Sequence, residues 1–180
     1  MMNELDVLLD VACKLKSVGL QYMLTGSFAM NYYAEPRMTR DIDIVVELNT
    51  SDVQKIVNTF SEEYYISENA VKEAIEKSRM FNIIHNESVV KVDFVVRKNE
   101  DFRLAEFKRR KIIKINNTDI QIVSIEDLII SKLIWAKESA SEMQKKDVKN
   151  LLNQSVDNEY LGTWIDKLEL TSIYKGITSA

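Results

Sequence analysis

The chain has 180 residues, of which 46% are hydrophobic and 29% charged, a composition typical of a globular domain with a core of its own. One proline and four glycines leave little material for long linkers, and a net charge of −4 argues against a broadly basic nucleic-acid-binding surface. The single cysteine, Cys13, excludes an internal disulfide. The single histidine, His85, leaves almost no ligands for a His/Cys zinc site or a His-dependent triad, so we expect both residues to be structural.

The sequence contains no membrane or export signal. No apolar run approaches the roughly 18–20 residues that span a bilayer. The first residues also lack the basic start of a signal peptide. We therefore expect a cytoplasmic protein with no membrane partner.

Helical spacing and strand alternation predict a chain in which strands and helices alternate over the first two-thirds. We expect helices over 4–18, 27–34, 51–60, 70–80, 101–110, 124–138, 142–154 and 160–168. We expect strands over 20–25, 41–48, 64–66, 81–85, 89–96, 112–115 and 120–123, with hairpins between the fourth and fifth and between the sixth and seventh. This order predicts a single domain, with an α/β core over 1–123 and a helical C-terminal cap over 124–180.

A short stretch near the N-terminus combines features that suit a metal and a phosphate. A Gly26-Ser27 turn follows an apolar run, and Ser27 is a good cap for the next helix. Asp41 and Asp43 follow in a β-rich run, where alternation predicts that both carboxylates share one strand face. Such a pair repels itself unless a cation bridges it, and Mg²⁺ prefers carboxylate oxygens. The turn offers backbone N–H groups and a hydroxyl to an anion.

Three residues farther along the chain are candidates for the same site. Asp93 lies in the middle of a later strand and converges on the pair if the two strands are neighbours; otherwise it is a lone polar residue. Lys132 interrupts an apolar helical stripe, so it either reaches water or meets an anion in a cleft. Asp147 lies on the inner edge of the next helix, where it pairs with Lys132, contacts the site or faces solvent.

Several other residues allow two interpretations. Arg37 and Arg40 either compensate the nearby carboxylates or bind phosphate, and Thr39 braces their loop. The basic run 108–111 suits a phosphate patch, although a solvated helix end is the simpler interpretation. We expect the remaining aromatic candidates to pack in the core rather than bind a ligand: Tyr32, Tyr33, Trp135 and Trp164.

Taken together, these residues resemble the nucleotidyltransferase fold superfamily that includes DNA polymerase β. Its pattern is a Gly-Ser motif that opens a helix, an Asp-x-Asp on the next strand and a third Asp on a later strand. Here these correspond to Gly26-Ser27, Asp41-x-Asp43 and Asp93. The segment from Arg37 to Asp43 is similar to the small bacterial branch of AbiEii-type toxins, as is a later motif with Lys132 and Asp147. The resemblance implies a mixed sheet flanked by helices.

The resemblance also implies a reaction, which is transfer of a nucleoside monophosphate from a nucleoside triphosphate to an acceptor hydroxyl with release of pyrophosphate. It implies Mg²⁺, or alternatively Mn²⁺, held in a two-metal site by Asp41, Asp43 and Asp93. It implies nucleotide binding by the remaining candidates, which are Gly26, Ser27, Arg37, Thr39, Lys132 and Asp147. The acceptor is left open between RNA such as tRNA, a protein and an aminoglycoside-like small molecule.

Two alternatives to a plain enzyme follow from the same sequence. The chain is expected to be either an active transferase, including the toxin of a toxin-antitoxin pair with a cognate antitoxin, or a catalytically silent nucleotide- or partner-binding module. A scaffold or antitoxin that uses the helical tail is the third possibility. The presence of all three carboxylates favours the enzyme.

Overall fold

A computed structural model describes residues 2–179 and contains one seven-stranded mixed sheet. The strand order is β3-β4-β5-β2-β1-β7-β6, with β2 parallel to β5 and β1 parallel to β7. The strands are β1 (Gln21–Thr25), β2 (Ile42–Glu47), β3 (Tyr64–Ile66), β4 (Met80–His85), β5 (Lys91–Val96), β6 (Lys111–Ile115) and β7 (Thr118–Ile122). The expected mixed sheet is therefore present, and both predicted hairpins are confirmed.

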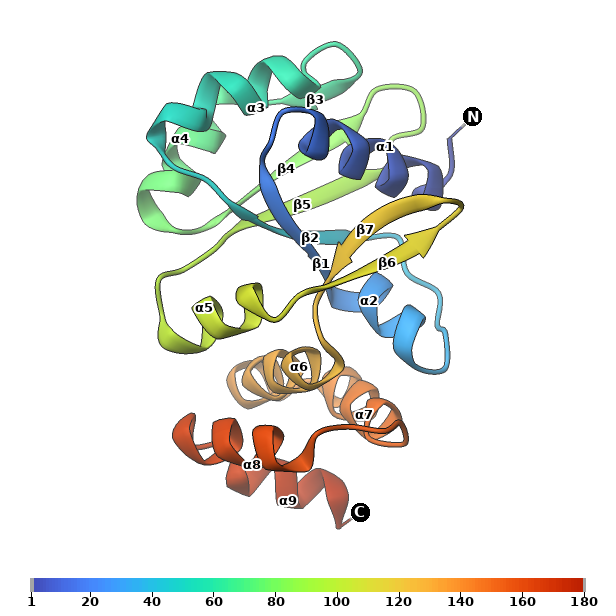
Figure 1. Cartoon of the computed structure of the whole chain (residues 1–180), viewed down its shortest axis with the longest axis vertical. Helices are drawn as coiled ribbons and strands as arrows, with labels where there is room; N and C mark the ends of the chain where they lie inside the picture. Colours follow the sequence, from blue (N-terminus) through green and yellow to red (C-terminus); the bar gives the residue numbers. More distant parts are fainter. Residues whose placement is uncertain (1, 180) are drawn as a thin grey trace.

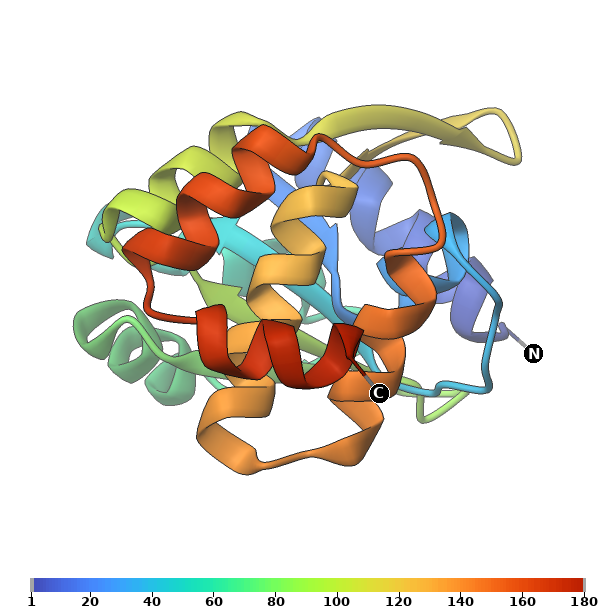
Figure 2. The same cartoon turned by 90° about the horizontal axis from the view of Figure 1, so that it is seen from below.

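Helices lie on both sides of this sheet (Figure 1). One face is covered by α1 (Glu4–Ser17), by α3 (Val53–Phe60), which follows the short 3-10 turn η1 (Thr50–Asp52), and by α4 (Glu68–Lys77). The other side holds α2 (Gly26–Tyr33), α5 (Asp101–Lys108), α6 (Ile125–Ser139), α7 (Glu142–Leu151), α8 (Asn158–Lys167) and α9 (Thr171–Thr178). Viewed from below, the last four helices form a layer in front of the sheet (Figure 2). None of the helices within residues 2–179 is long and apolar enough to cross a membrane.

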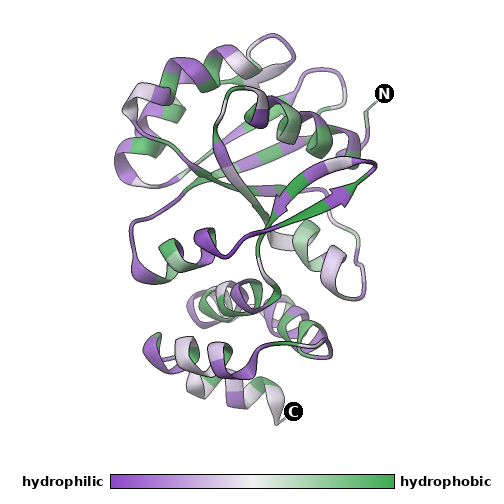
Figure 3. Ribbon diagram, in the orientation of Figure 1, coloured by the Kyte–Doolittle hydropathy of each residue, from purple (hydrophilic) through white to green (hydrophobic). Residues whose placement is uncertain are grey.

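Alternation along β2 and β5 separates a core face from a polar face. Ile42, Ile44 and Val46 are fully buried, as are Val92 and Phe94 on the neighbouring strand. The Phe94 ring lies 5.6 Å from that of Phe60 on α3, so this face forms the core beneath α1 and α3. Figure 3 shows the corresponding concentration of apolar residues along the strands. Asp43 and Asp93 therefore point to the opposite face, toward α6.

The strand that carries the Asp-x-Asp motif differs from the prediction in two ways. It begins at Ile42, so Asp41 precedes it as an exposed residue, and strand alternation does not fix the direction of its side chain. It also ends one residue earlier, at Glu47, and its Val45 shares the carboxylate face. The reason is the two-residue period of a strand, which places Val45 on the face of Asp43.

Several helix and strand boundaries also differ. The helix over 70–80 ends earlier, because Ser78 adopts the left-handed conformation and Met80 already belongs to β4. The helix after the Gly-Ser turn starts at Gly26, with Thr25 at the N-cap, so Ser27 lies in the first turn and does not cap it. The final helix α9 was not predicted. Ser124 caps α6, since its hydroxyl accepts a hydrogen bond from the Asp127 backbone.

We had expected the basic run at 108–111 to be a solvated helix end, but one of its residues, Arg109, is held in ion pairs. The Arg109 guanidinium donates hydrogen bonds to Asp127 and Glu126, both at 3.1 Å, and stacks 3.6 Å above the Tyr160 ring. The Tyr160 hydroxyl donates to the other oxygen of Asp127 at 2.6 Å. Since these residues belong to α6, α8 and the end of α5, Arg109 stabilises the packing of the C-terminal helices below the sheet.

Candidate active site

The parallel pairing of β2 with β5 brings two carboxylates side by side. Asp43 and Asp93 are direct register partners, one strand spacing apart, which is about 4.8 Å in general. Asp93 is 6% exposed, and its Oδ1 atom is buried without a hydrogen-bond partner among the described residues. Burial and the charges of Asp93 and Asp41 raise the pKa of Asp43 to about 6. The convergence predicted for Asp93 and Asp43 is therefore confirmed.

The Gly26-Ser27 turn packs directly against this pair. Thr25 is the register partner of Asp43 on β1, and Gly26 follows it with a φ of +64°. A Cβ atom at position 26 would lie 2.0 Å from Oδ2 of Asp43, so only glycine fits here. The turn thus places the first residues of α2, including Ser27, beside the Asp43 carboxylate.

Asp41 does not join this pair in the arrangement observed. Within residues 2–179, no three His, Cys, Asp or Glu side chains lie close enough together to hold a metal ion. Asp41 is instead linked to Asp93 through Lys91, which lies two residues before Asp93 on β5. Its ammonium lies 2.8 Å from Asp93 Oδ2 and 3.5 Å from Asp41 Oδ1. The structure therefore brings together two of the three predicted metal ligands and leaves the exposed Asp41 outside.

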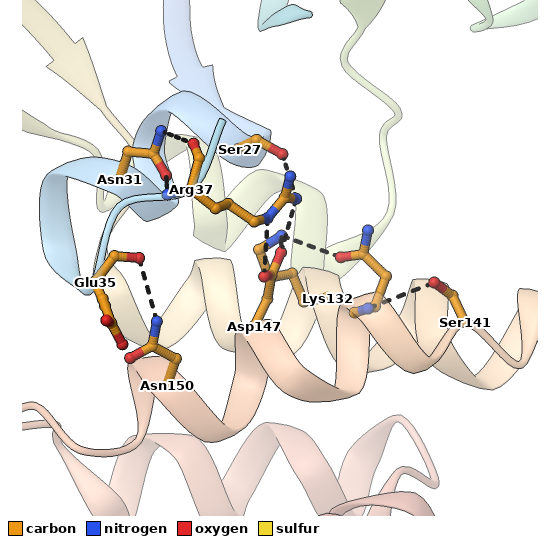
Figure 4. Close-up of polar contacts among 9 residues, drawn as sticks. Ser27, Asn31, Glu35, Arg37, Lys132, Ser141, Asp147 and Asn150 are labelled. Atoms are coloured by element: carbon orange, nitrogen blue, oxygen red, sulfur yellow. Dashed lines mark hydrogen bonds and ion pairs between the residues drawn. The ribbon is translucent and has the colours of Figure 1, made fainter. Parts of the chain in front are cut away.

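A polar network adjoins the carboxylates on the side of α2 and α7 (Figure 4). The Arg37 guanidinium donates two hydrogen bonds to Asp147, at 3.1 and 3.0 Å, and a third to the Ser27 hydroxyl at 2.7 Å. Lys132 donates to Asp147 at 2.7 Å and to Gln144 at 3.0 Å. Lys132 is therefore paired with a carboxylate rather than exposed to water, and Asp147 faces inward, not into solvent.

The network is almost completely shielded from water at its centre. Lys132 is 3% exposed and Asp147 is 2% exposed. Burial by itself raises the pKa of Asp147, but the hydrogen bonds from Arg37 and Lys132 outweigh it and hold that pKa below its ordinary value. Asp147 is consequently ionised at neutral pH, and it fixes both cations beside Ser27.

The loop that carries Arg37 is held in place by two asparagines. The Asn31 side chain accepts a hydrogen bond from the Arg37 backbone N–H and donates another to the Arg37 carbonyl, at 3.0 and 2.8 Å. Asn150 on α7 donates to the Glu35 carbonyl at 3.2 Å (Figure 4). Thr39 lies further along the same loop, half-buried, and Arg40 is exposed.

A cavity of about 470 Å³ is bordered by Gly26, Asp43 and Lys132 and extends toward α5. Its lining includes Val45 and Val95 from the sheet, Met80 at the start of β4, and Trp135 on α6. Trp135 is 54% exposed, which corrects the expectation that it packs in the core. The other tryptophan, Trp164, does pack against aromatic neighbours, with its ring 5.3 Å from that of Phe102.

The model of one protein family matches residues 11–148, which include every candidate site residue. Its description is "Nucleotidyl transferase AbiEii toxin, Type IV TA system". The chain belongs to this family. This AbiEii-family protein is accordingly a nucleotidyltransferase. No curated protein is similar enough in sequence to count as a relative.

Solved structures of nucleotidyltransferases share the fold of this AbiEii-family protein. An antigenic nucleotidyltransferase-like protein from Paracoccidioides brasiliensis is 15% identical at a TM-score of 0.58, with 94% of this chain and 88% of that chain covered. The antibiotic-resistance factor ANT(2'')-Ia is 14% identical at a TM-score of 0.57, covering 99% and 97%. The lincomycin-bound lincosamide antibiotic adenylyltransferase LnuA is 17% identical at a TM-score of 0.52, covering 82% and 94%.

The sequence interpretation gave no role to several residues that the structure places in or beside the site. Lys91 shares a strand face with Asp93, which the two-residue alternation does predict, but its contacts depend on how the loop before β2 folds. Gln144 completes the contacts of Lys132, and Asn31 clamps Arg37. Neither has a sequence signal of its own, because both act through partners that are distant in the chain or reached only through a loop.

Proposed function

We propose that this AbiEii-family protein transfers a nucleoside monophosphate from a nucleoside triphosphate to an acceptor hydroxyl, with release of pyrophosphate. The observation that carries the proposal is the register pair of Asp43 and Asp93 beside the Gly26-Ser27 turn. The arrangement places two adjacent carboxylates next to donors that suit an anion, and a metal-bound triphosphate satisfies both. The family's own chemistry, nucleotidyl transfer, supports this interpretation.

The residues present fit a divalent metal. The Oδ1 atom of Asp93 is a buried oxygen without a partner, and carboxylates are the ligands that Mg²⁺ and Mn²⁺ prefer. Asp43 and Asp93, with Asp41 from the adjoining loop, would hold the metal. A bound divalent cation would neutralise the reacting phosphate and lower the pKa of the attacking hydroxyl.

The phosphate-binding side of the site is the network around Asp147. The backbone of Gly26 and the hydroxyl of Ser27 open α2, whose N-terminus favours a negative charge. Arg37 and Lys132 add two positive charges, and Thr39 lies on the same loop. Asp147 orients both cations before substrate binds, so little reorganisation is required when the triphosphate charge must be stabilised. We assign nucleotide binding to these six residues.

The cavity on the α5 side provides space for the rest of the reactants. It is lined by Gly26, Asp43 and Lys132 of the proposed site and continues toward α5 and Trp135, so it suits the acceptor or the nucleoside portion of a triphosphate whose phosphates bind at Gly26 and Lys132. Two solved structures with this fold concern antibiotics: the resistance factor ANT(2'')-Ia, and LnuA with lincomycin. They favour testing small-molecule acceptors such as an aminoglycoside. The family description of a toxin equally favours RNA, tRNA or protein acceptors, and a cognate antitoxin as partner.

The experiment that tests the proposal is label transfer. The protein is incubated with Mg²⁺ and each α-³²P-labelled nucleoside triphosphate, with total tRNA, cell protein or a panel of aminoglycosides as acceptor. We expect label in one acceptor class, and a loss of at least about 10³-fold in the Asp43→Asn, Asp93→Asn double variant.

The matched control is the Asp119→Asn variant, which changes an exposed carboxylate paired with Lys114 at the β6–β7 hairpin. It should transfer label at the wild-type rate. Transfer that persists in the double variant would contradict the site assignment. Triphosphate binding without transfer to any acceptor would favour the silent binding module instead.

A further inference from the structure

Lys91 places a positive charge between two of the carboxylates that we assign to the metal site. It lies on β5 two residues before Asp93, so the two side chains share the polar face of the sheet. Its ammonium is 2.8 Å from Asp93 Oδ2 and 3.5 Å from Asp41 Oδ1. One lysine thus joins the carboxylate inside the site to the carboxylate on the loop before β2.

The burial of the three groups differs along this contact. The Asp93 side chain is 8% exposed, whereas the Lys91 side chain is 40% exposed and the Asp41 side chain is 63% exposed. A buried carboxylate needs a counter-charge, and the ammonium provides one without itself being enclosed. Because the lysine is long and half exposed, it can withdraw into water while Asp93 stays fixed by its strand.

Lys91 and a divalent cation would bind the same two carboxylates. Asp93 Oδ2 and Asp41 Oδ1 already face the ammonium, while Asp93 Oδ1 has no partner within the described residues. A metal that gathers Asp41, Asp43 and Asp93 would therefore lie close to the ammonium, whichever oxygens it used. Repulsion between the metal and a nearby ammonium would oppose binding as long as the lysine stays in place.

We propose that Lys91 is a resident counter-cation that holds Asp41 and Asp93 in the absence of metal and thereby sets the metal affinity of the site. The inference rests on the proposed function, because it assumes that these carboxylates bind the metal. Free metal competes with the ammonium and binds weakly. Metal carried by a triphosphate brings its own negative charge, which offsets the repulsion, so metal and nucleotide bind together.

The test is a titration of the nucleotide-free protein with Mn²⁺, with free Mn²⁺ followed by electron paramagnetic resonance. Lys91→Met removes the charge and keeps a chain of similar length, and Lys91→Arg keeps the charge. The matched control is Lys72→Met, which removes an exposed lysine paired with Glu68 on α4 and changes the net charge equally. We expect Lys91→Met to bind Mn²⁺ about tenfold more tightly, and the other two variants to stay within about twofold of wild type.

Thermal unfolding gives a second measurement. Without metal, Lys91→Met should unfold at a lower temperature than wild type, since Asp93 loses its counter-charge. Saturating Mn²⁺ should raise the midpoint more in Lys91→Met than in wild type. A purely structural ion pair would lower the midpoint equally with and without the metal.

The outcomes separate the inference from the proposed function. If Asp93→Asn weakens Mn²⁺ binding but Lys91→Met leaves the affinity unchanged or weaker, the role of Lys91 is overturned and the metal site stands. If neither wild type nor Lys91→Met binds Mn²⁺ in a manner that depends on Asp93, both the metal site and the inference are overturned. Tighter binding by Lys91→Met that disappears in the Lys91→Met, Asp93→Asn double variant supports both.

Discussion

Two acidic residues on the same side of the sheet, the buried Asp147 and the half-buried Asp43, have opposite surroundings. Asp147 accepts hydrogen bonds from three nitrogen atoms, two of Arg37 and one of Lys132, and its pKa lies below the ordinary value. Asp43 instead lies beside Asp93, with Asp41 nearby, and its pKa is raised to about 6. The first carboxylate is satisfied by its protein partners, and the second is not.

This difference indicates which carboxylate positions other residues and which takes part in the reaction. A satisfied carboxylate contributes rigidity, since removal of any partner leaves an uncompensated buried charge. A carboxylate pair that repels itself reduces the stability of the empty protein, and folded proteins accept such conflicts mainly at functional sites. We therefore assign reaction to the Asp43–Asp93 pair, and positioning of Arg37 and Lys132 to Asp147.

The strongest test of this comparison removes Asp147. The Asp147→Ala variant leaves Lys132 buried without its ion-pair partner, and we expect it to lower the free energy of unfolding by about 3–5 kcal/mol. Urea denaturation in the absence of metal and nucleotide measures the change. The Lys132→Met, Asp147→Leu double variant should recover a large part of this loss, because it removes both buried charges together.

An effect of Asp147→Ala below about 1 kcal/mol would show that the network is not a structural brace. The exposed Asp166 on α8, whose carboxylate accepts a hydrogen bond from Thr171, provides the control position. We expect Asp166→Ala to change the unfolding free energy by no more than about 0.5 kcal/mol.

At the Asp43–Asp93 pair, we expect a substitution to raise the unfolding free energy rather than lower it. Asp43→Asn removes one of two adjacent negative charges, and we expect it to raise the unfolding free energy of the metal-free protein by about 2 kcal/mol at pH 7.5. Nucleotidyl transfer should be lost in the same variant. A gain in stability together with a loss of activity is expected when a carboxylate serves the reaction rather than folding.

The stability of the wild type should depend on pH in the corresponding direction. The folded-state pKa of Asp43, about 6, lies above its ordinary value of 3.8, so the folded state binds the proton more tightly. The stability associated with this proton is fully present below pH 3.8 and is lost as the pH rises through 6. The advantage of Asp43→Asn over wild type, measured by urea denaturation with a chelator, should therefore shrink between pH 7.5 and pH 4.5. An advantage that is constant over this range would contradict the assignment.

The sequence was sufficient to predict the parts of the site that depend on local periodicity. The Gly26-Ser27 turn, the face of Asp43 and the face of Asp93 follow from a glycine before a helix and from the two-residue period of strands. The pairing of β2 with β5 was stated as a condition, because strand order depends on contacts between distant segments. The place of Lys132 in an apolar helical stripe left two alternatives, contact with water or with an anion in a cleft, and the structure shows the buried one.

Features that depend on loops and on tertiary partners could not be predicted in the same way. Asp41 lies just before its strand, where its exposed carboxylate contacts the ammonium of Lys91. Arg109 had the sequence pattern of a solvated helix end, yet the packing of α6 and α8 provides it with two carboxylates. Trp135 fits the apolar spacing of α6, but the sheet and α5 leave a cavity at its position.

Trp135 provides the test with the smallest expected effect on stability. It asks whether the phosphates bind at the polar network while the nucleoside or the acceptor binds in the cavity. The exposed Trp135 indole lines the cavity that also borders Asp43 and Lys132, and it makes no part of the core, so we expect Trp135→Ala to change the unfolding free energy by no more than about 0.5 kcal/mol. Trp164→Phe leaves Trp135 as the only tryptophan, whose fluorescence then reports on the cavity. The nucleoside triphosphate that donates label, or its acceptor, should quench this fluorescence, whereas tripolyphosphate should bind the network without quenching.

Quenching by the nucleotide would place the nucleoside in the cavity, and quenching by the acceptor alone would place the acceptor there. Equal quenching by tripolyphosphate, or none by either reactant, would contradict the division of the site into a phosphate side and a cavity side.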